Sequence, residues 1–458
     1  MFPLAKARTV VVGGGPAGVA AALACARMRG AGRRGEGPDV LLIEQHGYLG
    51  GCSTAGLVGP WMTFHARDGR QVVDGIPQEI VDRLVAAGGS PGHIRDALGV
   101  IYSFTPVEPT ALKFVLDDMV KESGAEVLFH ARFCGVETSG GRIEAVRVAH
   151  PGGVFDIRGE VFVDATGNGE LAAMAGAPWE MGRSQDGLCQ ALTLIFRMSN
   201  VDAPRVKEYM KAHPEEFHHT TDLEILEKTG FLSCSGFFGV WRGGLDRGEV
   251  SIPRDRLLFF STPRHGEILV NTTRVVKTNP LDPFELSRAE LVAREQVRQL
   301  TEFLRRRVPG FEDSYLLDIA STIGVRESRR ILGDHVLTAG DILAGRRFED
   351  GVCMGAYPID IHDPSGSGLV YREEPEGFLY SIPYRCLTAK NTENLLVVGR
   401  CISATHEATA SVRVTATCLG MGQAAGVAAS LAPHGRVREV DVAHLRERIR
   451  QLGGCIID

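Results

Sequence analysis

The chain has 458 residues, of which 44% are hydrophobic and 23% are charged, and its formal net charge at pH 7 is −6. This composition is that of a globular protein with two domains or one elaborated domain, and the charge gives no indication of nucleic-acid binding. Ten cysteines without a Cys-x-x-Cys pair argue against structural zinc, iron–sulfur clusters and a disulfide framework. No apolar run reaches membrane-spanning length, and the first motif lies too near Met1 for a signal peptide, so we expect a cytoplasmic protein.

The most informative stretch is residues 9–18, TVVVGGGPAG. Its valines predict a buried parallel strand, and Gly13, Gly15 and Gly18 follow with G-x-G-x-x-G spacing before an alanine-rich helix. The first glycine allows a tight turn, the second allows a pyrophosphate to approach the helix N-terminus, and the third allows close helix–strand packing. The next predicted strand ends at Glu44, which we expect to bind the ribose hydroxyls. Together these features predict a bound dinucleotide.

Three later segments favour FAD over NAD as that dinucleotide. A second glycine pair, Gly50-Gly51, follows the first unit, and the predicted strand in 161–167 ends in a turn of small residues. A strand in 394–400 then leads to a glycine-rich helix over 418–431. An NAD site is completed within one contiguous unit, whereas this chain returns to the same domain much later, which suits an extended flavin cofactor. We find no second G-x-G-x-x-G after a strand, so we expect no dedicated NAD(P)H domain.

The residues predicted to contact FAD lie in these turns or directly beside them. They are Gly13, Gly15, Pro16, Ala17, Gly18, Glu44, Gln45, Gly50, Gly51, Cys52, Ser53, Thr54, Phe133, Ala165, Thr166, Gly167, Gly399, Arg400, Ser411, Arg413 and Val414. No cluster of ligands with metal-binding spacing is visible, so we expect no metal site.

The chain resembles the bacterial FAD-dependent oxidoreductase family of the glutathione-reductase-like, two-dinucleotide-fold flavoprotein superfamily. The resemblance spans nearly the whole chain, and it is most specific in 161–176 (VFVDATGNGELAAMAG), 324–338 (GVRESRRILGDHVLT), 357–362 (YPIDIH) and 394–429. It implies an FAD-dependent enzyme in which the protein orients a substrate and supplies proton transfer and electrostatics.

We expect an α/β fold in which a Rossmann-like FAD-binding domain, discontinuous in sequence, carries an inserted α+β substrate domain. The FAD-binding domain is expected to span 1–184, with an excursion at 59–104 that covers the flavin, and to resume at 381–458. The substrate or cap domain would then occupy 185–380.

The second domain contains several predicted elements. Strand-like runs lie at 192–197, 257–261 and 267–271, and one long helix is predicted to begin at Ser287. Glu290, three residues later, would complete a capping box at that helix start.

Cys52 follows the second glycine pair and has no partner cysteine nearby, so dithiol chemistry is not expected. The resembling succinate dehydrogenase and fumarate reductase families place a residue here against the flavin, and in some of them it is a histidine bound covalently to FAD. Two roles are therefore open for Cys52: it forms a thioether with FAD, or it is a small residue packed beside the cofactor.

Three residues are candidates for catalysis. His406 lies where the resemblance implies that the chain passes the reactive face of the flavin, and we expect it to act as the general base. His362 alternates with Asp360, so on a strand both would face one side. Arg326 would fork onto a flavin carbonyl or a substrate carboxylate. Arg413 is expected to open the final helix and to balance negative charge on the flavin; for each of these residues a structural role is the alternative.

Tyr357, Tyr384 and Arg385 are candidates for substrate binding, with packing as the alternative for both tyrosines. The leading hypothesis is a dehydrogenase or oxidase that transfers a hydride between a small polar organic substrate and FAD. Oxygen, a quinone or a partner protein would reoxidise the flavin. A redox-neutral isomerase, hydratase or lyase, and a flavin-bearing subunit or sensor that acts through protein contacts, are the alternatives. Substrate identity, the electron acceptor and homo-oligomer formation are left open.

Overall fold

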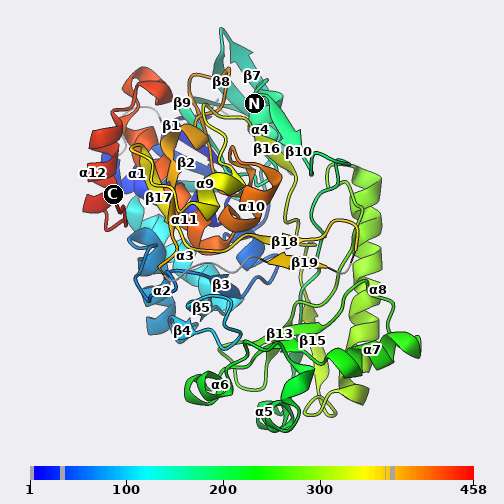
Figure 1. The fold of residues 1–458 in the computed structure, drawn as a ribbon. Helices are drawn as coiled ribbons and strands as arrows, with labels where there is room; N and C mark the ends of the chain where they lie inside the picture. Colours follow the sequence, from blue (N-terminus) through cyan, green and yellow to red (C-terminus); the bar gives the residue numbers. More distant parts are fainter. Residues whose placement is uncertain (1–4, 31–36, 367, 372–376) are drawn as a thin grey trace.

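The structure is a computed structural model that describes residues 5–30, 37–366, 368–371 and 377–458. Its first sheet has seven strands, five of which are joined by parallel pairing (Figure 1). The spatial order is β6 (Glu126–Leu128), β2 (Val40–Ile43), β1 (Ala5–Val12), β9 (Gly153–Asp164), β8 (Arg142–His150) and β7 (Arg132–Ser139), and β21 (Leu395–Val397) pairs with β9. The predicted α/β fold with a Rossmann-like sheet is confirmed.

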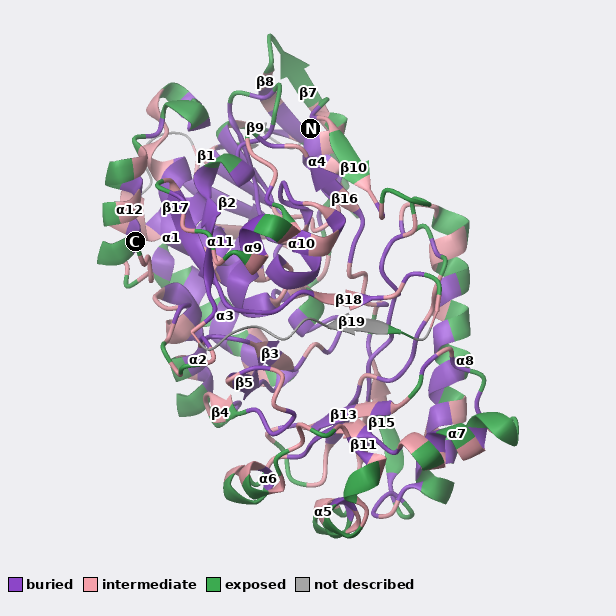
Figure 2. Ribbon diagram, viewed as in Figure 1, coloured by how far each residue is buried: buried purple, intermediate pink, exposed green. Residues whose placement is uncertain are grey.

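Two helices distant in sequence pack together against this sheet. They are α1 (Pro16–Arg29) and α11 (Thr415–Leu431), and both are almost entirely buried (Figure 2). A Cβ on Gly422 of α11 would lie 2.1 Å from the carbonyl oxygen of Ala17, so a side chain at this position would push the helices apart. The small residues of both segments therefore close the domain by bringing the two backbones into contact.

The excursion at 59–104 forms a small subdomain beside these helices. It consists of β3 (Pro60–Met62), α2 (Ile76–Ala86), β4 (Ile94–Arg95) and β5 (Ser103–Pro106) and is followed by α3 (Pro109–Ser123). Gln423 of α11 accepts a hydrogen bond from the backbone N–H of Ile76 at 2.9 Å, and Phe104 packs edge-on against Phe260 of the second sheet. The subdomain thus contacts both larger parts of the molecule.

The second sheet is antiparallel and has its own hydrophobic core. Its order is β12 (Ser233–Gly236), β13 (Leu257–Ser261), β14 (Ile268–Val270), β11 (Phe196–Ser199) and β15 (Tyr315–Ile319). Its helices are α5 (Ala203–Ala212), α6 (Leu223–Thr229), α7 (Phe238–Asp246) and α8 (Pro283–Arg307). The predicted strand 257–261 is confirmed. The strand expected at 192–197 begins only at Phe196, because Leu192 and Thr193 make isolated bridges instead.

The remaining elements join the two parts. They are α4 (Glu170–Met174), β10 (Trp179–Met181) with β16 (Arg329–Ile331), α9 (Ala339–Leu343), β17 (Gly351–Gly355) with β20 (Tyr380–Pro383), β18 (Asp360–His362) with β19 (Leu369–Tyr371), α10 (His406–Val412) and α12 (Val442–Gln451). Residues from 337 to 361 and from 378 to 387 pack into the core that contains α1 and α11, although much of this stretch was expected in the second domain. In Figure 1, β18 and β19 lie between the two larger sheets.

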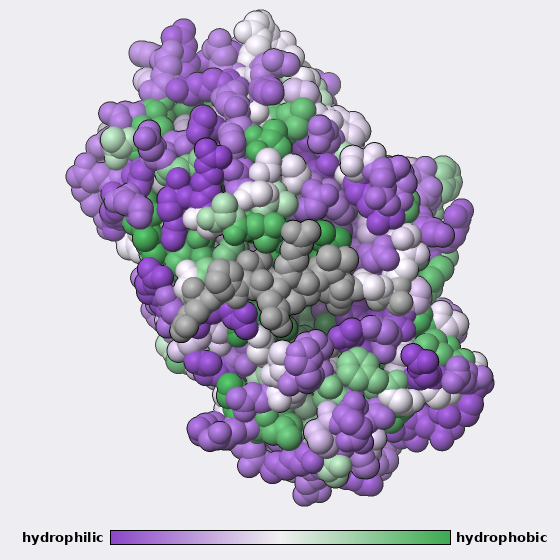
Figure 3. Space-filling model, viewed as in Figure 1, coloured by the Kyte–Doolittle hydropathy of each residue, from purple (hydrophilic) through white to green (hydrophobic). Residues whose placement is uncertain are grey.

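The face of the molecule that Figure 3 shows is mainly polar. Figure 3 shows hydrophilic residues over most of the visible face, with apolar residues gathered in separate patches. In the parts of the chain that the structure describes, no single helix is both long enough and apolar enough to cross a membrane. The pair α10 and α11 reaches that length and composition only together, and the two helices are bent by 91°.

The start of α8 differs from the sequence prediction. The helix begins at Pro283, and the side chain of Asp282 accepts hydrogen bonds from the backbone N–H groups of Phe284 and Glu285, each at 2.9 Å. The prediction that the helix begins at Ser287 was wrong, because the Ser287 hydroxyl donates back to the carbonyl of Pro283 within the first turn. Proline at the first helical position was the stronger start signal.

This assignment makes a prediction for stability. Asp282→Ala removes the acceptor of two N–H groups at the helix N-terminus and is expected to lower the free energy of unfolding by about 1 kcal/mol. The matched control Ser287→Ala is expected to leave it unchanged within about 0.5 kcal/mol. Urea unfolding of both variants measures the difference. The reverse ranking would restore Ser287 as the cap.

Candidate active site

The turn between β1 and α1 has the conformation expected from its glycines. Gly13 has φ of +106°, and a Cβ there would lie 2.4 Å from the carbonyl oxygen of Ala165. A Cβ on Gly18 would lie 1.8 Å from the carbonyl oxygen of Gly13. A Cβ on Gly15, in contrast, would meet no described atom within 4 Å. Space is therefore open in front of Gly15, where the N–H groups at the start of α1 favour a phosphate.

Glu44 ends β2 beside this turn. Its carboxylate accepts hydrogen bonds from the backbone N–H groups of Gly14 and His46, each at 2.7 Å. These bonds fix the side chain at the mouth of the glycine turn. Each carboxylate oxygen keeps a further lone pair, so the expected contact with the ribose hydroxyls stays a prediction.

The second glycine pair lies directly against the first turn. Gly50 and Gly51 have φ of +101° and +49°, and a Cβ on Gly51 would lie 2.8 Å from the Cα atom of Gly15. Cys52 follows in a recess, where its side chain is accessible but surrounded by protein atoms. Burial raises the pKa of the Cys52 thiol, although the nearby charge of Arg400 partly opposes this shift. The thiol is therefore protonated at neutral pH.

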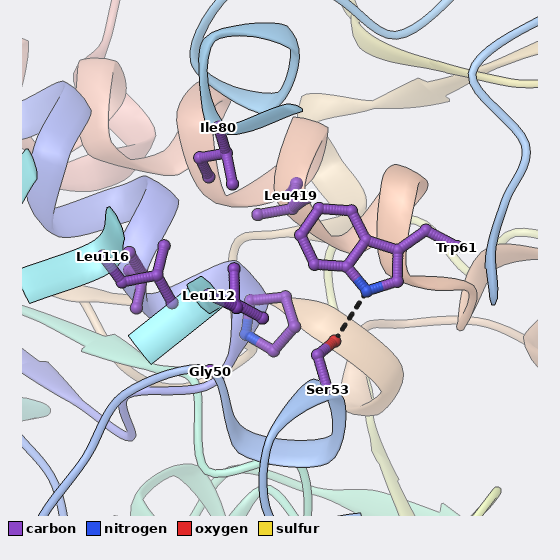
Figure 4. Close-up of a pocket in the computed structure, with 9 residues that line it drawn as sticks. Gly50, Ser53, Trp61, Ile80, Leu112, Leu116 and Leu419 are labelled. Carbon is purple, nitrogen blue, oxygen red and sulfur yellow. Dashed lines mark hydrogen bonds between the residues drawn. The ribbon is translucent and has the colours of Figure 1, made fainter. Parts of the chain in front are cut away.

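A small cavity lies behind the second glycine pair (Figure 4). Its lining is mostly apolar, and the indole N–H of Trp61 donates to the Ser53 hydroxyl at 2.9 Å. The lining residues are Pro16, Val19, Gly50, Ser53, Trp61, Ile80, Leu112, Leu116 and Leu419. No ionisable side chain reaches this cavity among the described residues, so it supports no acid–base chemistry.

Arg400 connects the return strand β21 to the turn after β9. Its guanidinium donates to the carbonyl oxygens of Gly167 at 2.7 Å and Val325 at 2.5 Å, and to the side chain of Asn168 at 2.7 Å. Burial lowers the pKa of Arg400, and nearby Cys52 acts in the opposite direction. Arg400 thus brings together three chain segments that the sequence separates widely, and it stands next to Cys52.

Three further residues expected at the cofactor have structural partners. Phe133 on β7 is buried in the hydrophobic core on the opposite face of the sheet. Ser411 is fully buried in α10, where its hydroxyl donates to the carbonyl of Tyr357 and shares a 2.6 Å hydrogen bond with Tyr380. Val414 is the residue before α11. Their contact with FAD stays a prediction.

His406 is the first residue of α10 and is held by a buried carboxylate. Its Nδ1 atom lies 2.8 Å and 3.0 Å from the two carboxylate oxygens of Glu327, which is fully buried. Glu327 also forms an ion pair with Arg330 and accepts the backbone N–H of Gln190 at 3.1 Å. These partners fix the histidine ring through its Nδ1 atom, so Nε2 is the ring nitrogen that the Glu327 carboxylate does not contact. The sequence indicated His406 but gave no sign that Glu327, 79 positions earlier, would hold it.

A second polar cluster surrounds β18. Asp360 and His362 face one side as predicted, with His362 Nε2 3.4 Å from Asp360 Oδ2. The Tyr357 hydroxyl donates to the same oxygen at 3.1 Å, and Arg413 lies 3.9 Å from it. Although burial alone would raise the pKa of Asp360, His362, Arg413 and Arg326 together lower it. Burial, reinforced by the charge of Arg326, lowers the pKa of His362 to about 3, so this histidine is neutral at pH 7.

Gln190 links the two clusters and was not singled out from the sequence. Its backbone N–H binds Glu327, and its side-chain oxygen lies 3.4 Å from a guanidinium nitrogen of Arg413. It is fully buried, and its Nε2 atom has no partner among the described residues.

Arg413 itself ends α10 two residues before α11 begins, so the expectation that it opens the final helix was wrong. The final helix of the chain is α12.

Of the remaining site residues predicted from the sequence, Arg326 acts on the polar cluster around Asp360, whereas Tyr384 and Arg385 have partners outside it. Arg326 donates to the carbonyl of Ala191 and the hydroxyl of Thr193, both at 2.6 Å, and burial together with neighbouring arginines lowers its pKa. The Tyr384 hydroxyl instead donates to the carbonyl of Val437 at 2.7 Å. Arg385 pairs with Asp350 at 2.9 Å, with half of its side chain exposed. The contacts of Tyr384 and Arg385 thus lie outside both polar clusters.

Comparison with protein families identifies the chain. The model of a family described as FAD dependent oxidoreductase matches residues 9–449. The chain belongs to this family. FAD is accordingly its cofactor, and the open space at Gly15 fits the pyrophosphate of that cofactor. Comparison with curated proteins gives no match.

Several solved structures are similar to this oxidoreductase at low identity. A geranylgeranyl bacteriochlorophyll reductase-like protein from Thermoplasma acidophilum is 13% identical over 98% of this chain and 83% of its own, with a TM-score of 0.45. L-proline dehydrogenase from P. horikoshii is 13% identical over 99% of this chain and 100% of its own, with a TM-score of 0.43. p-Nitrophenol 4-monooxygenase from Pseudomonas putida is 11% identical over 98% and 81%, with a TM-score of 0.45.

The environment of Cys52 predicts how the FAD is held. Because burial raises the pKa of this thiol, little nucleophilic thiolate forms at neutral pH. Acid precipitation of the yellow protein is therefore expected to release all flavin into the supernatant, and Cys52→Ala is expected to retain bound FAD. Flavin that stays with the wild-type pellet and is released from the Cys52→Ala pellet would instead establish a thioether.

Proposed function

We propose that this FAD-dependent oxidoreductase is a dehydrogenase or oxidase that transfers a hydride between a small polar organic substrate and FAD. An external acceptor, such as oxygen, a quinone or a partner protein, then reoxidises the flavin. The observation that supports this proposal most strongly is the buried pair formed by His406 and Glu327. His406 lies seven residues after Gly399, in the turn predicted to contact the cofactor. Membership of the glutathione-reductase-like superfamily is part of the same proposal.

Glu327 determines which nitrogen of His406 can react. The carboxylate accepts from Nδ1, which fixes the hydrogen on that atom and leaves the lone pair on Nε2. Arg330 pairs with the same carboxylate and the Gln190 N–H donates to it, so the carboxylate is held in place. Nε2 is then positioned to accept a proton from a substrate hydroxyl or amine.

FAD supplies the two-electron acceptor when bound. The protein binds the dinucleotide at the glycine turns, holds the flavin region through the segments that Arg400 connects, and removes the substrate proton at His406. The cluster around Asp360 and His362 offers hydrogen-bonding groups for a polar substrate.

Anaerobic reduction tests the proposal. The purified protein, loaded with FAD, is mixed without oxygen with a panel of hydroxy acids, sugars and amines while the flavin absorbance is recorded. Bleaching by at least one class, followed by recovery of the oxidised spectrum on adding oxygen or a quinone, is the expected result. Product formation without bleaching or an acceptor would favour the redox-neutral alternative. A flavin that none of these compounds reduces would contradict hydride transfer from them.

A further inference from the structure

One arginine in the second domain is buried without any visible partner. Arg254 lies between α7 and β13 and is 3% exposed, and none of its three side-chain nitrogens has a hydrogen-bond partner among the described residues. Its backbone is held in place, because the Trp241 indole donates to the Arg254 carbonyl at 2.7 Å. Burial and the nearby charge of Arg274 lower the pKa of Arg254 to about 10, so the guanidinium is still charged at pH 7.

A buried charge of this kind is costly unless a counter-charge and hydrogen-bond acceptors are present. An arginine offers five N–H donors in a rigid fork and cannot avoid the cost by losing its proton at neutral pH. The arrangement is therefore incomplete without an acceptor that carries negative charge.

Arg254 belongs to a group of four arginines that influence one another. Burial and the charges of Arg413, Arg254 and Arg274 lower the pKa of Arg326. The partners of these arginines are mainly neutral. Arg274, 1% exposed, donates to three backbone carbonyls and keeps one free nitrogen, and Arg326 donates to a carbonyl and a hydroxyl. The charges of Asp255, Asp360 and Asp363 also act on this group, but Asp255 pairs with Arg256, Asp363 pairs with Arg183, and Asp360 is shared between Arg413 and His362. None of the three accepts a hydrogen bond from Arg254.

Other unpaired groups lie around Arg413 and Asp360. The Nε2 atom of Gln190, the Nε atom of Arg413 and the Nδ1 atom of His362 are buried without a partner among the described residues. The Oδ1 atom of Asp360 is also unpaired there and would repel an anion, so an anion would lie toward the arginines. Through Gln190 this group joins Glu327 and hence His406.

We propose that Arg254, with Arg274, Arg326 and Arg413, forms a binding site for the carboxylate group of the substrate. This inference rests on the proposed function, and it narrows the polar substrate to an organic acid. A carboxylate fits because it accepts two parallel N–H bonds from one guanidinium and supplies the missing negative charge. It would anchor the substrate while the neighbouring part of the molecule faces His406.

Binding of unreactive probes tests the site without turnover. The FAD-loaded protein is titrated with acetate and propionate, with the matched amides acetamide and propionamide, and with inorganic phosphate. Shifts in the flavin spectrum and in the unfolding midpoint report binding. We expect at least one carboxylate to bind and its amide to bind at least 30-fold more weakly, because the amide lacks the charge.

The variants are Arg254→Met, which keeps a flexible unbranched apolar side chain but removes the guanidinium and its charge, and the exposed control Arg242→Met on α7. Arg254→Met is expected to weaken carboxylate binding about 30-fold or more and to raise the unfolding midpoint in anion-free buffer, because an unpaired buried charge is removed. Arg242→Met is expected to match the wild type in both. Arg254→Gln serves as a second variant if the first does not fold.

The outcomes separate this inference from the proposed function. Equal carboxylate affinity in the wild type and the Arg254 variant, equal binding of amides and carboxylates, or binding of phosphate alone would overturn the carboxylate site. If one of these binding results were obtained and an uncharged substrate still reduced the flavin, the carboxylate site would be wrong and the proposed hydride transfer would still hold. Carboxylate binding that depends on Arg254, with no flavin reduction by any compound, would uphold the site and contradict hydride transfer.

Discussion

Replacing His406 with glutamine is expected to slow substrate-dependent reduction of the flavin by about 10²–10⁴-fold, the usual contribution of a general base. Glutamine can still donate a hydrogen bond to Glu327, so the ion pair with Arg330 and the local structure should persist. It cannot accept a proton. Anaerobic stopped-flow measurement of flavin bleaching at saturating substrate gives the rate constant directly.

The pH profile distinguishes loss of a base from a structural effect. Any dependence of the wild-type rate on pH that comes from this general base should be absent from His406→Gln. His444→Gln, an exposed histidine on α12, is the matched control and should keep both rate and profile. A His406→Gln variant that bleaches at the wild-type rate would move the role of base elsewhere, with His362 the next residue to test.

The second large effect is expected from two glycines three residues apart. Gly18→Ala would place a methyl group 1.8 Å from the carbonyl oxygen of Gly13, and it is expected to destabilise the protein by about 3 kcal/mol. The gain in helix propensity, about 1 kcal/mol, is too small to compensate. Gly15→Ala adds its methyl group to open space, so the apoprotein should lose about 0.5 kcal/mol or less.

For FAD affinity we expect the larger direct effect from Gly15→Ala, whereas for stability we expect it from Gly18→Ala. The methyl group of Gly15→Ala occupies the space assigned to the pyrophosphate, so FAD affinity is expected to fall roughly 10–100-fold while the fold is kept. Urea unfolding of the apoprotein and fluorescence titration with FAD measure the two quantities separately. A stable Gly18→Ala protein would contradict the close contact of Gly18 with Gly13. A Gly15→Ala protein with wild-type FAD affinity would contradict the placement of the pyrophosphate in this turn.

The sequence predicted those parts of the structure whose causes are local. The spacing of Gly13, Gly15 and Gly18 indicates a strand, turn and helix because Gly18 meets the carbonyl oxygen of Gly13 within the same unit, while Gly15 leaves the start of the helix open. The alternation of Asp360 and His362 predicted a shared face for the same reason. The start of α8 was missed because two capping residues lie five positions apart, and proline after Asp282 should have decided between them.

The parts that could not be predicted depend on burial and on distant partners. Because most arginines are exposed, the sequence predicts that Arg254 lies at the surface. The structure shows instead that it is buried. Likewise, nothing near Glu327 or Gln190 indicates that both converge on His406.

The packing of α1 against α11 also has a consequence for how the chain acquires its cofactor in the cell. The guanidinium of Arg29 donates to the carbonyl of Ala429, 400 positions later, so the first helix finds its partner only when synthesis is nearly complete. The second hydrophobic core consists mainly of residues from Leu192 to Val325, joined by Leu57 and Ala97 from earlier in the chain, so all of it is synthesised before α11 and can assemble first. A ribosome that stops before α11 therefore releases a chain whose dinucleotide turn is made but has no helix to close over it.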